Sequence, residues 1–486
     1  MPASRPGRAR HWCPALLAIL LLLTGARMYL FVAHEPLLGY ANNYDMIRLQ
    51  ACHQIWPVDE KFPPGLQSPS RPIERYEKAV RLKYASCFPS SEMLFTSVFA
   101  ALQAEGETFS IRELALLRAA LSVMLLSLLL AALYAASPAL SLVAAFVALL
   151  LLPDPFNALY LPTFYTEWSA TLGLFLSLPA LLLALARPAS NAAAATLFLA
   201  LAFWGLSKAQ HLYAPALAFA CMLPAALALG WRPLWRPLLA AALAGVLVLA
   251  LQAQWLDHER NHAVRKANAI NTYLYTVLPS ARDPHGLAQA LGLERSCGDH
   301  AGLSWYSEQL DRSALPCPEV FEANRLRLLA LPLIDPAAFR NLLVNADPHL
   351  RPVFTDYLGQ VADVEFGAAA QHVVSLFTWL DAVPSATLAI LVGCLAAIAV
   401  AWGLLGLWRQ PRCAGPGIAL FTLLLFLGVY PLSAFTVALF GDGYADLAKH
   451  SHLAFNGVML LVAALAIGVL TGAWHRFGAP RTPPTR

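Results

Sequence analysis

The stretch CPALLAILLLLTGARMYLFVA, residues 13–33, is apolar almost throughout. Its length matches the roughly 20 apolar residues that an α-helix needs to cross a hydrocarbon layer about 30 Å thick. The rest of the chain repeats this pattern, because 58% of its 486 residues are hydrophobic and only 13% are charged. A soluble domain carries about 25% charged residues. The sequence therefore predicts an integral membrane protein rather than a soluble protein with a large core.

About ten segments, within a range of roughly nine to eleven, are apolar enough to span a membrane. They cover residues 13–33, 113–135, 138–153, 166–186, 191–207, 211–230, 237–256, 384–407, 416–439 and 452–473, and the segments 138–153 and 191–207 are the shortest. We therefore expect an all-α integral membrane protein.

Arginines near the helix ends predict how the chain crosses the membrane, because basic residues there favour the cytoplasm. With ten spans, the basic residues of the short loops and termini fall on one side: Arg5, Arg8, Arg10, Arg187, Arg232, Arg236, Arg409, Arg412, Arg476 and Arg481. We expect both termini in the cytoplasm and a multi-pass protein of the bacterial inner (plasma) membrane. Residues 34–112 and 257–383 then lie outside the cytoplasm.

The two long outer segments are predicted to be mostly helical. In residues 34–112, IERYEKAVRLKY (73–84) and SSEMLFTSVFAALQ (90–103) both have helical spacing of apolar residues. The segment 257–383 has the same spacing, interrupted by prolines. The expected organisation is an N-terminal membrane core (1–256), a helical insert (257–383), and a C-terminal membrane segment with a tail (384–486).

The beginning of the chain allows two interpretations. RPGRARHWCPALLAILLLLTGAR (5–27) has the basic residues, short apolar run and small residues of a cleavable signal peptide. The apolar pattern resumes in MYLFV (28–32), which favours a retained helix. That helix requires Arg27 to face protein or to extend its side chain to the outer interface.

Four of the eight cysteines lie in pairs within single outer segments, Cys52 with Cys87 and Cys297 with Cys317. Disulfides form in oxidising compartments outside the cytoplasm. We expect these two disulfides, with four unpaired thiols as the alternative, because sequence alone does not determine connectivity.

Ionisable residues gather at the outer ends of the predicted spans. They are Asp45, Arg48, Glu167, Lys208, His211, Asp442, Asp446, Lys449, His450 and His452. The interiors of the spans are nearly free of charge, whereas a transporter is expected to bind its substrate near the bilayer midplane. A site at the outer boundary suits a substrate with a lipid tail and a polar head.

These residue types suggest transfer chemistry on a lipid phosphate. Asp45 is the candidate general base, and Glu167 is a second carboxylate that orients the sugar or assists proton transfer. The candidates for binding substrate and phosphate are Asn43, Arg48, Lys208, His211, Lys449 and His450. No cofactor is expected, and the histidines of KHSH, at i and i+2, do not share a helix face for zinc.

Each residue also has a plainer interpretation. Asp45 can form a surface ion pair with Arg48 at i+3, and Glu167 can interact with the helix macrodipole. Asp442 can be a turn residue, and Lys208 and His211 can be interfacial residues that reach water. The combined pattern is stronger, because four separate loops carry charge at one boundary.

The order NNYDMIR (42–48), FYTEW (164–168), SKAQHLYAP (207–215) and KHSHLAFN (449–456) resembles GT-C integral-membrane glycosyltransferases, most of all the WsfD-type hexosyltransferases of bacterial glycan biosynthesis. The resemblance implies a polyprenyl-phosphate-linked sugar donor, Asp45 as the base, and basic outer residues that hold the lipid phosphate. Many GT-C first loops carry two adjacent acidic residues, whereas Tyr44 and Met46 flank Asp45. Metal dependence is therefore not expected. The insert 257–383 matches no motif of the class.

The resulting hypothesis is a glycosyltransferase that moves a hexose from a polyprenyl-phosphate carrier to an extracytoplasmic glycan or glycolipid. Its expected partners are this donor, the acceptor and membrane lipid. A net charge of +4 without a basic block gives no support to nucleic-acid binding. Two alternatives stay open. They are a polysaccharide polymerase or ligase, in which Arg351 matters more than Asp45, and a transporter or flippase of lipid-linked sugars.

Overall fold

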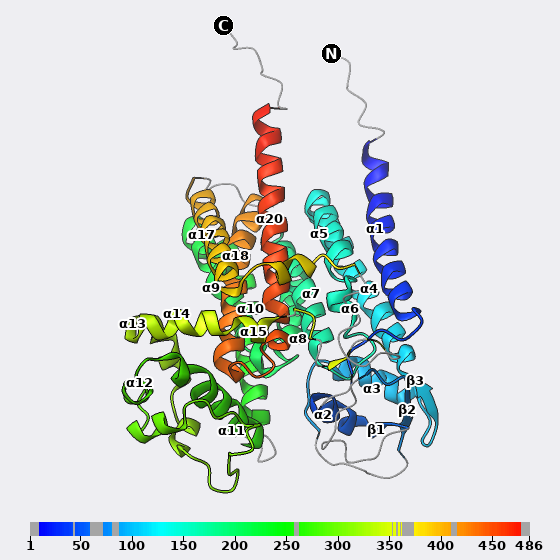
Figure 1. Ribbon diagram of the computed structural model, residues 1–486. Coiled ribbons are helices and arrows are strands. Elements are labelled where there is room, and N and C mark those ends of the chain that lie inside the picture. Colours follow the sequence, from blue (N-terminus) through cyan, green and yellow to red (C-terminus); the bar gives the residue numbers. More distant parts are fainter. Residues whose placement is uncertain are drawn as a thin grey trace, which may run out of the picture.

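The computed structural model describes residues 9–41, 44–58, 71–79, 87–256, 262–351, 353–355, 358–359, 361, 374–409 and 416–477. The candidate Asn43 and the orientation residues Arg5, Arg8, Arg412 and Arg481 lie outside these ranges. Long helices form a bundle, and the first helix (residues 9–32) begins at the same end of it at which the last helix (residues 452–477) finishes (Figure 1). The other end carries the described parts of residues 34–110 and 262–351, and we call it the loop side.

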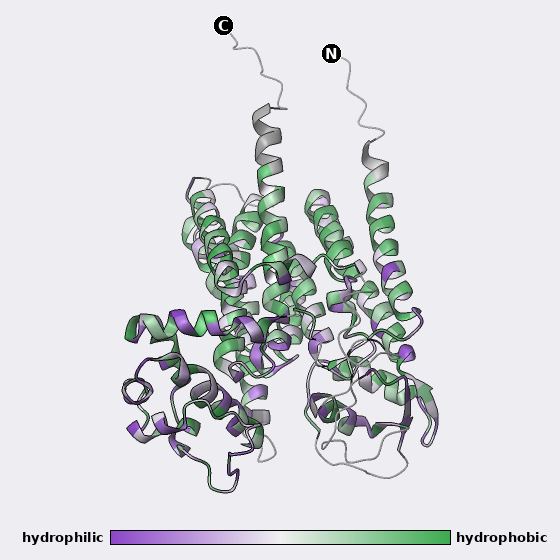
Figure 2. Ribbon diagram, viewed as in Figure 1, coloured by the Kyte–Doolittle hydropathy of each residue, from purple (hydrophilic) through white to green (hydrophobic). Residues whose placement is uncertain are grey.

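Eight segments of the described chain are helices long and apolar enough to cross a membrane. They comprise α1 (Ala9–Val32), α4 (Ile111–Ala136), α7 (Glu167–Ala186), α9 (Ala214–Leu229) with the short helix before it, α10 (Trp231–Leu256), α17 (Ser385–Arg409), α18 (Pro416–Asp442) and α20 (His452–Phe477). The two shortest predicted spans are also helices, α5 (Pro138–Leu151) and α8 (Asn191–Gly205). Figure 2 shows apolar residues along the bundle and polar ones at the loop side. The predicted all-α membrane class is confirmed.

Helix α7 forms the centre of the bundle, since 94% of its apolar window is buried. It packs against α4, α8 and α18. Close approach to α8 depends on Gly173, where a Cβ atom would lie 2.8 Å from the Cα atom of Trp204. The helix begins at Glu167, so this packing fixes the position of that carboxylate at the loop side.

The packing of helix α1 decides between the two positions expected for the Arg27 side chain, facing protein or reaching the outer interface. The helix packs on α4 and α5. The Nη1 atom of Arg27 donates hydrogen bonds to the carbonyl oxygens of Leu149 and Leu150 at the end of α5. Arg27 therefore faces protein, which satisfies part of its hydrogen-bonding capacity inside an apolar helix.

The first loop contains α2 (Tyr44–His53), α3 (Met93–Leu102) and a small antiparallel sheet. Strand β2 (Arg75–Lys78) lies between β1 (Ile55–Pro57) and β3 (Thr108–Ser110). The predicted helix in 90–103 is confirmed. The one over 73–84 is wrong in its described part, because residues 75–78 form β2, and residues 80–84 lie outside the described ranges. The buried ring of Tyr76 stacks on Phe109, and pairing on both sides of the strand outweighs the local helical spacing. Helix α4 then starts with a capping box between Ser110 and Glu113.

The insert is built mainly from short helices, as predicted. Its elements are α11 (His262–Ile270), the π-helix η3 (Asn271–Val277), η4 (Leu278–Ser280), α12 (Pro284–Ala290), η5 (Arg295–His300), η6 (Pro318–Phe321), η7 (Arg325–Ala330), α13 (Leu331–Ile334), α14 (Pro336–Asn345), α15 (Asp347–Leu350) and η9 (Thr378–Ala382). Three more short helices lie among the bundle connections: α6 (Pro155–Ala158), η1 (Ala209–His211) and α19 (Leu447–His450).

Candidate functional site

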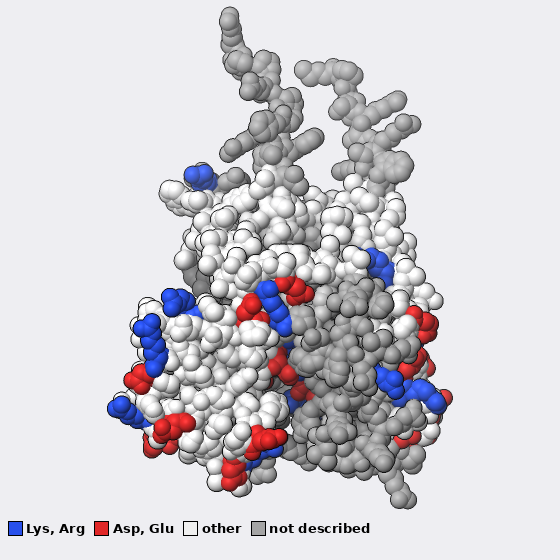
Figure 3. Space-filling model, in the orientation of Figure 1, with Lys and Arg blue, Asp and Glu red and all other residues white. Residues whose placement is uncertain are grey.

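Four segments far apart in sequence bring charged side chains to the loop side of the bundle. Asp45 lies in the first turn of α2, Glu167 opens α7, and Lys208 precedes η1. The fourth segment runs from the end of α18 at Asp442 into α19. We define the ionic cluster by the eight residues Asp45, Arg48, Glu167, Lys208, Asp442, Asp446, Lys449 and His450. Figure 3 shows acidic and basic side chains gathered over the half of the molecule that carries the loops.

Lys449 joins the first loop to the turn before α20. Its Nζ atom lies 2.6 Å from Asp45 Oδ2 and 2.8 Å from Asp446 Oδ2. The second carboxylate oxygen of Asp45 lies 3.1 Å from Arg48 Nη2. The Lys449 side chain is fully buried, whereas those of Asp45 and Arg48 are 26% and 27% exposed. Lys449 is therefore an internal counter-ion, and Arg48 is the cation of this half that solvent reaches.

Lys208 joins α7 to α19 in the second half of the cluster. Its Nζ atom donates to Glu167 Oε1 at 2.8 Å and lies 3.3 Å from His450 Nδ1. The other ring nitrogen of His450, Nε2, is 3.3 Å from Asp442 Oδ2. Because Lys449 and His450 are neighbours in α19, the two halves share one short helix.

The charges of the cluster act strongly on Asp45. Burial by itself would raise the pKa of this carboxyl group, but the cations of Lys449, Arg48 and Lys208 outweigh it and hold the pKa well below its usual range. The pKa of Asp446 is lowered in the same way, since Lys449 and His450 outweigh the effect of its burial. Both groups are therefore ionised at neutral pH, and Asp45 is a weak base as long as both its cations remain in place.

Two predicted phosphate ligands are not available as the sequence suggested. Lys449 is enclosed between carboxylates, with no exposed side-chain surface. The residue His211 is 3% exposed, and its ring makes no hydrogen bond within the described chain. Among the described candidates, Arg48 and Lys208 have the most exposed side chains, at 27% and 21%, followed by His450 at 12%.

Sequence reasoning missed a second ion pair near the cluster. Glu92, just before α3, and Arg118, inside α4, are both fully buried and lie 2.6 Å apart. A guanidinium group inside a predicted span is rare and needs a partner, so Arg118 was a usable signal. Its partner could not be identified, because Glu92 lies in the loop sequence before the span.

The structure joins Cys52 to Cys87 and Cys297 to Cys317 by disulfides. Within the described residues, the one group of side chains close enough to hold a metal ion is Cys297, Cys317 and Glu319. Its two sulfur atoms already form the second disulfide, so no thiolate is left to bind a metal there.

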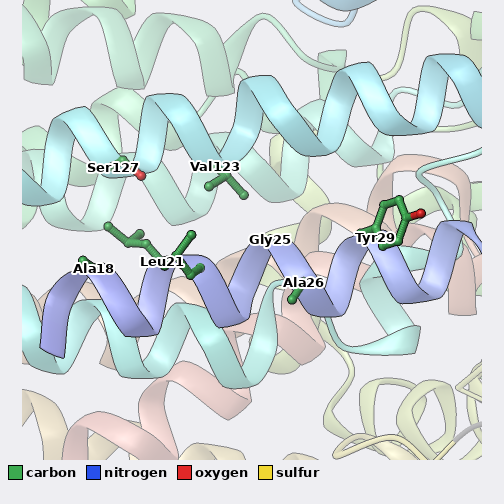
Figure 4. A pocket seen from close by; sticks show the side chains of 8 residues that line it. Ala18, Leu21, Gly25, Ala26, Tyr29, Val123 and Ser127 are labelled. Carbon is green, nitrogen blue, oxygen red and sulfur yellow. The ribbon is translucent and has the colours of Figure 1, made fainter. Parts of the chain in front are cut away.

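An apolar groove of about 570 Å³ lies between α1 and α4, away from the cluster (Figure 4). Leu21, Gly25 and Val123 are among the residues that line it, and its lining contains no acidic or basic side chain. The groove offers an apolar surface to lipid and no group for transfer chemistry.

Comparison with known proteins places the chain in a family. No curated protein matches it significantly. Among solved structures, it is similar to the archaeal oligosaccharyltransferase AglB from Archaeoglobus fulgidus, in complex with an inhibitory peptide and a dolichol-phosphate. The identity is 14% and the TM-score 0.39, over 97% of this chain and 53% of that chain. A likeness of this strength identifies neither a fold nor an activity. The family model of the YfdI N-terminal transmembrane domain matches residues 7–476. The chain therefore belongs to the YfdI N-terminal transmembrane domain family.

Proposed function

We propose that the protein is a membrane glycosyltransferase that moves a hexose from a polyprenyl-phosphate carrier to a glycan or glycolipid. The observation that carries the proposal is the ionic cluster, in which accessible cations and carboxylates from four segments meet at the loop-side end of an apolar bundle. A carrier with its tail in the membrane presents its phosphate and sugar at this level. The resemblance of the sequence motifs to GT-C enzymes, and to the WsfD type among them, supports the same reaction.

In the proposed reaction, a hydroxyl oxygen of the acceptor attacks C1 of the hexose. The bond between C1 and the phosphate oxygen breaks, and polyprenyl phosphate leaves with the bonding electrons. The proton of the attacking hydroxyl passes to the Asp45 carboxylate. Arg48 and Lys208 neutralise the charge on the leaving phosphate, because they are the accessible cations of the cluster.

Arg48 has two roles in this proposal. In the structure it lies 3.1 Å from Asp45 and keeps that carboxylate weakly basic. The phosphodiester monoanion of a donor bound beside Arg48 competes for its guanidinium group, since bidentate pairing with phosphate is strong. Movement of Arg48 toward the phosphate, together with the added negative charge, raises the pKa of Asp45. Donor binding would thus activate the base.

The proposed location follows from the distribution of arginines. Arg187 follows the last residue of α7, and Arg236 lies near the start of α10. Both helix ends are remote from the ionic cluster. Basic residues favour the cytoplasm. We propose that the loop side faces away from the cytoplasm of a bacterial inner membrane, and that the reaction takes place on its outer face.

A complementation experiment tests the function. A deletion strain is complemented with the wild-type protein, with Asp45→Asn, or with Glu35→Gln as a matched control, and the surface polysaccharide is analysed by mass spectrometry. Glu35 is a first-loop carboxylate that pairs with Arg112 outside the cluster. We expect the wild type and Glu35→Gln to restore a hexose that Asp45→Asn does not, because loss of a general base slows transfer by about 10²–10⁴-fold. An unchanged glycan with Asp45→Asn, at equal protein levels in the membrane, would refute the proposal.

The same strains separate the alternatives. A flippase predicts that complete glycan accumulates on the cytoplasmic face of the deletion strain, whereas the proposed transferase predicts a shortened glycan outside. A polymerase or ligase predicts that Arg351→Gln has a larger effect than Asp45→Asn. Arg351 pairs with Asp347 at 3.1 Å and donates to the carbonyl of Asp381. Both partners lie in the insert, so these contacts do not involve the ionic cluster.

A further inference from the structure

One loop of the insert, residues 302–307, is held beside the ionic cluster by two hydrogen bonds to the π-helix η3. Gly302 N donates to Leu274 O at 2.8 Å, and Trp305 N donates to Asn271 Oδ1 at 2.8 Å. Gly302 has φ 100°, which a residue with a side chain rarely adopts. The loop therefore has a defined conformation, fixed at its start and its middle.

Helix η3 also holds the segment that carries the cluster residues after α18. Asn271 Nδ2 donates to Asp442 Oδ1 at 3.0 Å, and Tyr444 N donates to Thr276 Oγ1 at 2.8 Å. A Cβ atom on Gly443 would lie 2.5 Å from the Asn271 carbonyl oxygen, so the two backbones are in close contact. Asn271, which is 1% exposed, thus bonds the loop through its oxygen and the cluster through its nitrogen.

Further contacts, from Arg312 and from within the loop, hold Trp305 and the backbone of Tyr306 in place. Arg312 donates two hydrogen bonds to the Trp305 carbonyl, and its guanidinium group lies 5.7 Å from the centroid of the Trp305 ring. Ser304 Oγ accepts a hydrogen bond from Tyr306 N at 3.2 Å. A group held this way loses little conformational entropy when it binds a ligand.

Tyr306 is left at the tip of this braced loop with 68% of its surface exposed. Its hydroxyl group makes no hydrogen bond within the described residues. Its surroundings raise the pKa of the phenol to about 12, through desolvation and through the negative charges of Asp446, Asp442 and Asp45. Its neighbour Trp305 is tied through the Asn271 side chain to Asp442, so the loop that carries Tyr306 lies beside the cluster. An exposed aromatic ring beside carboxylates is the combination that suits a sugar, because the ring packs on C–H groups and the carboxylates accept hydrogen bonds from hydroxyl groups.

We propose that Tyr306 is a specificity-determining residue that packs its ring against the pyranose ring of the lipid-phosphate donor. This inference rests on the proposed function. The sugar of such a donor is bonded directly to its phosphate, so a phosphate beside Arg48 and Lys208 brings the sugar near the same carboxylates that surround Tyr306. The two hydrogen bonds of the Asn271 side chain hold the loop and Asp442 next to each other.

The test measures binding to the full-length protein in detergent micelles. The probes are the methyl ester of a short-chain polyprenyl phosphate, called the bare lipid phosphate here, and the same lipid phosphate carrying glucose, galactose or mannose. All are diesters with one negative charge, so they differ in the sugar alone, and the dissociation constant of each is measured by titration. The variants are Tyr306→Ala, Tyr306→Trp, and Leu333→Ala as a control, since Leu333 is a large residue of the same insert with 88% exposure.

We expect the wild type to bind at least one sugar-bearing probe more tightly than the bare lipid phosphate. Tyr306→Ala should weaken binding of that probe by about 3- to 10-fold, the range for an aromatic packing contact, and leave the bare lipid phosphate unchanged. Tyr306→Trp should keep most of the preference, because it keeps a flat ring. Leu333→Ala should match the wild type with every probe.

Other outcomes would overturn the inference in distinguishable ways. If the wild type prefers a sugar-bearing probe and Tyr306→Ala keeps that preference, the proposed role of Tyr306 is wrong while the proposed function stands. The same holds if Tyr306→Ala leaves donor binding intact but slows transfer, because the ring then contacts the acceptor. If the wild type binds every sugar-bearing probe no better than the bare lipid phosphate, the proposed donor class fails, and the role of Tyr306 fails with it.

Discussion

Two groups of charges lie at the loop side of this protein, and they differ in what surrounds them. The Glu92–Arg118 pair is fully buried. Arg118 also donates to the carbonyls of Leu161 and Thr163, and Glu92 accepts from Ser169 N at 3.0 Å. In the ionic cluster, by contrast, Asp45 and Arg48 keep about a quarter of their side-chain surface exposed.

The difference favours a structural role for the buried pair and supports the chemical role that we propose for the cluster. The buried pair is enclosed by protein groups and joins α3, α4 and the start of α7. The cluster is open to solvent and contains cations that can exchange a carboxylate for a phosphate. Being charged near a membrane boundary is therefore not sufficient to indicate a site. Accessibility and the number of protein partners distinguish the two cases.

The largest expected loss of folding free energy comes from breaking the buried Glu92–Arg118 pair. Arg118→Leu removes one partner and leaves the Glu92 carboxylate unpaired in the interior, which should cost about 3–5 kcal/mol of folding free energy. Arg48→Leu, at the partly exposed pair, should cost less than about 1 kcal/mol. Thermal unfolding in detergent, followed by intrinsic fluorescence, measures both. Equal melting temperatures for the two variants would remove the distinction, whereas partial recovery in a Glu92→Leu/Arg118→Leu double variant would support it.

Lys449 lies between the two cases, because it is buried but its carboxylate partners are partly exposed. Lys449→Met should cost about 1–2 kcal/mol at neutral pH. The pKa values of Asp45 and Asp446 are lowered in the folded protein, so their stabilising contribution is present above the pKa of the unfolded chain and is lost as pH falls through the folded pKa.

The measurement is the melting temperature as a function of pH. For the wild type, it should begin to fall as the pH drops through about 4, where the unfolded carboxyl groups take up protons. The Lys449→Met variant should show a smaller fall over the same range. A steeper acid dependence in the variant than in the wild type would contradict this account of Lys449.

A smaller effect is expected for Arg48 in catalysis. Arg48→Gln removes a positive charge beside Asp45, so the pKa of that carboxyl group rises. The acid limb of kcat/KM, which reports the free enzyme, should move to higher pH by the same amount. The wild-type limb should lie below about pH 4, since the pKa of Asp45 is held well below its usual range. An acid limb at the same pH in both proteins would mean that Asp45 is not the titrating base.

The smallest effect is expected for an exposed pair outside both groups. Glu35 is 77% exposed and lies 3.0 Å from Arg112, which also pairs with Glu74 at 2.7 Å. Glu35→Gln should change the folding free energy by less than about 0.5 kcal/mol and leave transfer unchanged. Differential scanning fluorimetry provides the check. If Glu35→Gln lost as much folding free energy as Lys449→Met, the exposure of an ion pair would not predict its contribution to stability.

The membrane helices were predictable from sequence, but parts of the loops were not. Apolar runs identified all ten predicted spans as helices, including the short α5 and α8. Residues 75–78 were predicted as helix because their local spacing fits one, yet β2 pairs with strands centred near Trp56 and Phe109. Pairing over such sequence distances is a tertiary effect that a local pattern does not contain.

The candidate site was predictable as a set of residues but not as a set of contacts. Asp45, Glu167, Lys208 and His450 were selected because each was predicted to lie at the outer end of a span, and all four lie in the ionic cluster. The burial of Lys449 and His211 was not foreseen, because exposure depends on which helices pack around a residue. Tyr306 was missed entirely, since a tyrosine in an insert without a motif has no distinguishing local signal.

The sequence by itself determined that this is a multi-pass α-helical membrane protein with most of its charges outside the helix interiors. That follows because the free energy of placing a residue in hydrocarbon depends mainly on the residue and its near neighbours. Only the tertiary structure decided which charges meet. Asp45 and Lys449 are 404 residues apart and lie within 2.6 Å because helices far apart in the chain pack side by side. Such packing depends on the shape of whole helices, so the ion pairs, the buried Glu92–Arg118 link and the placement of Tyr306 appear only in the folded chain.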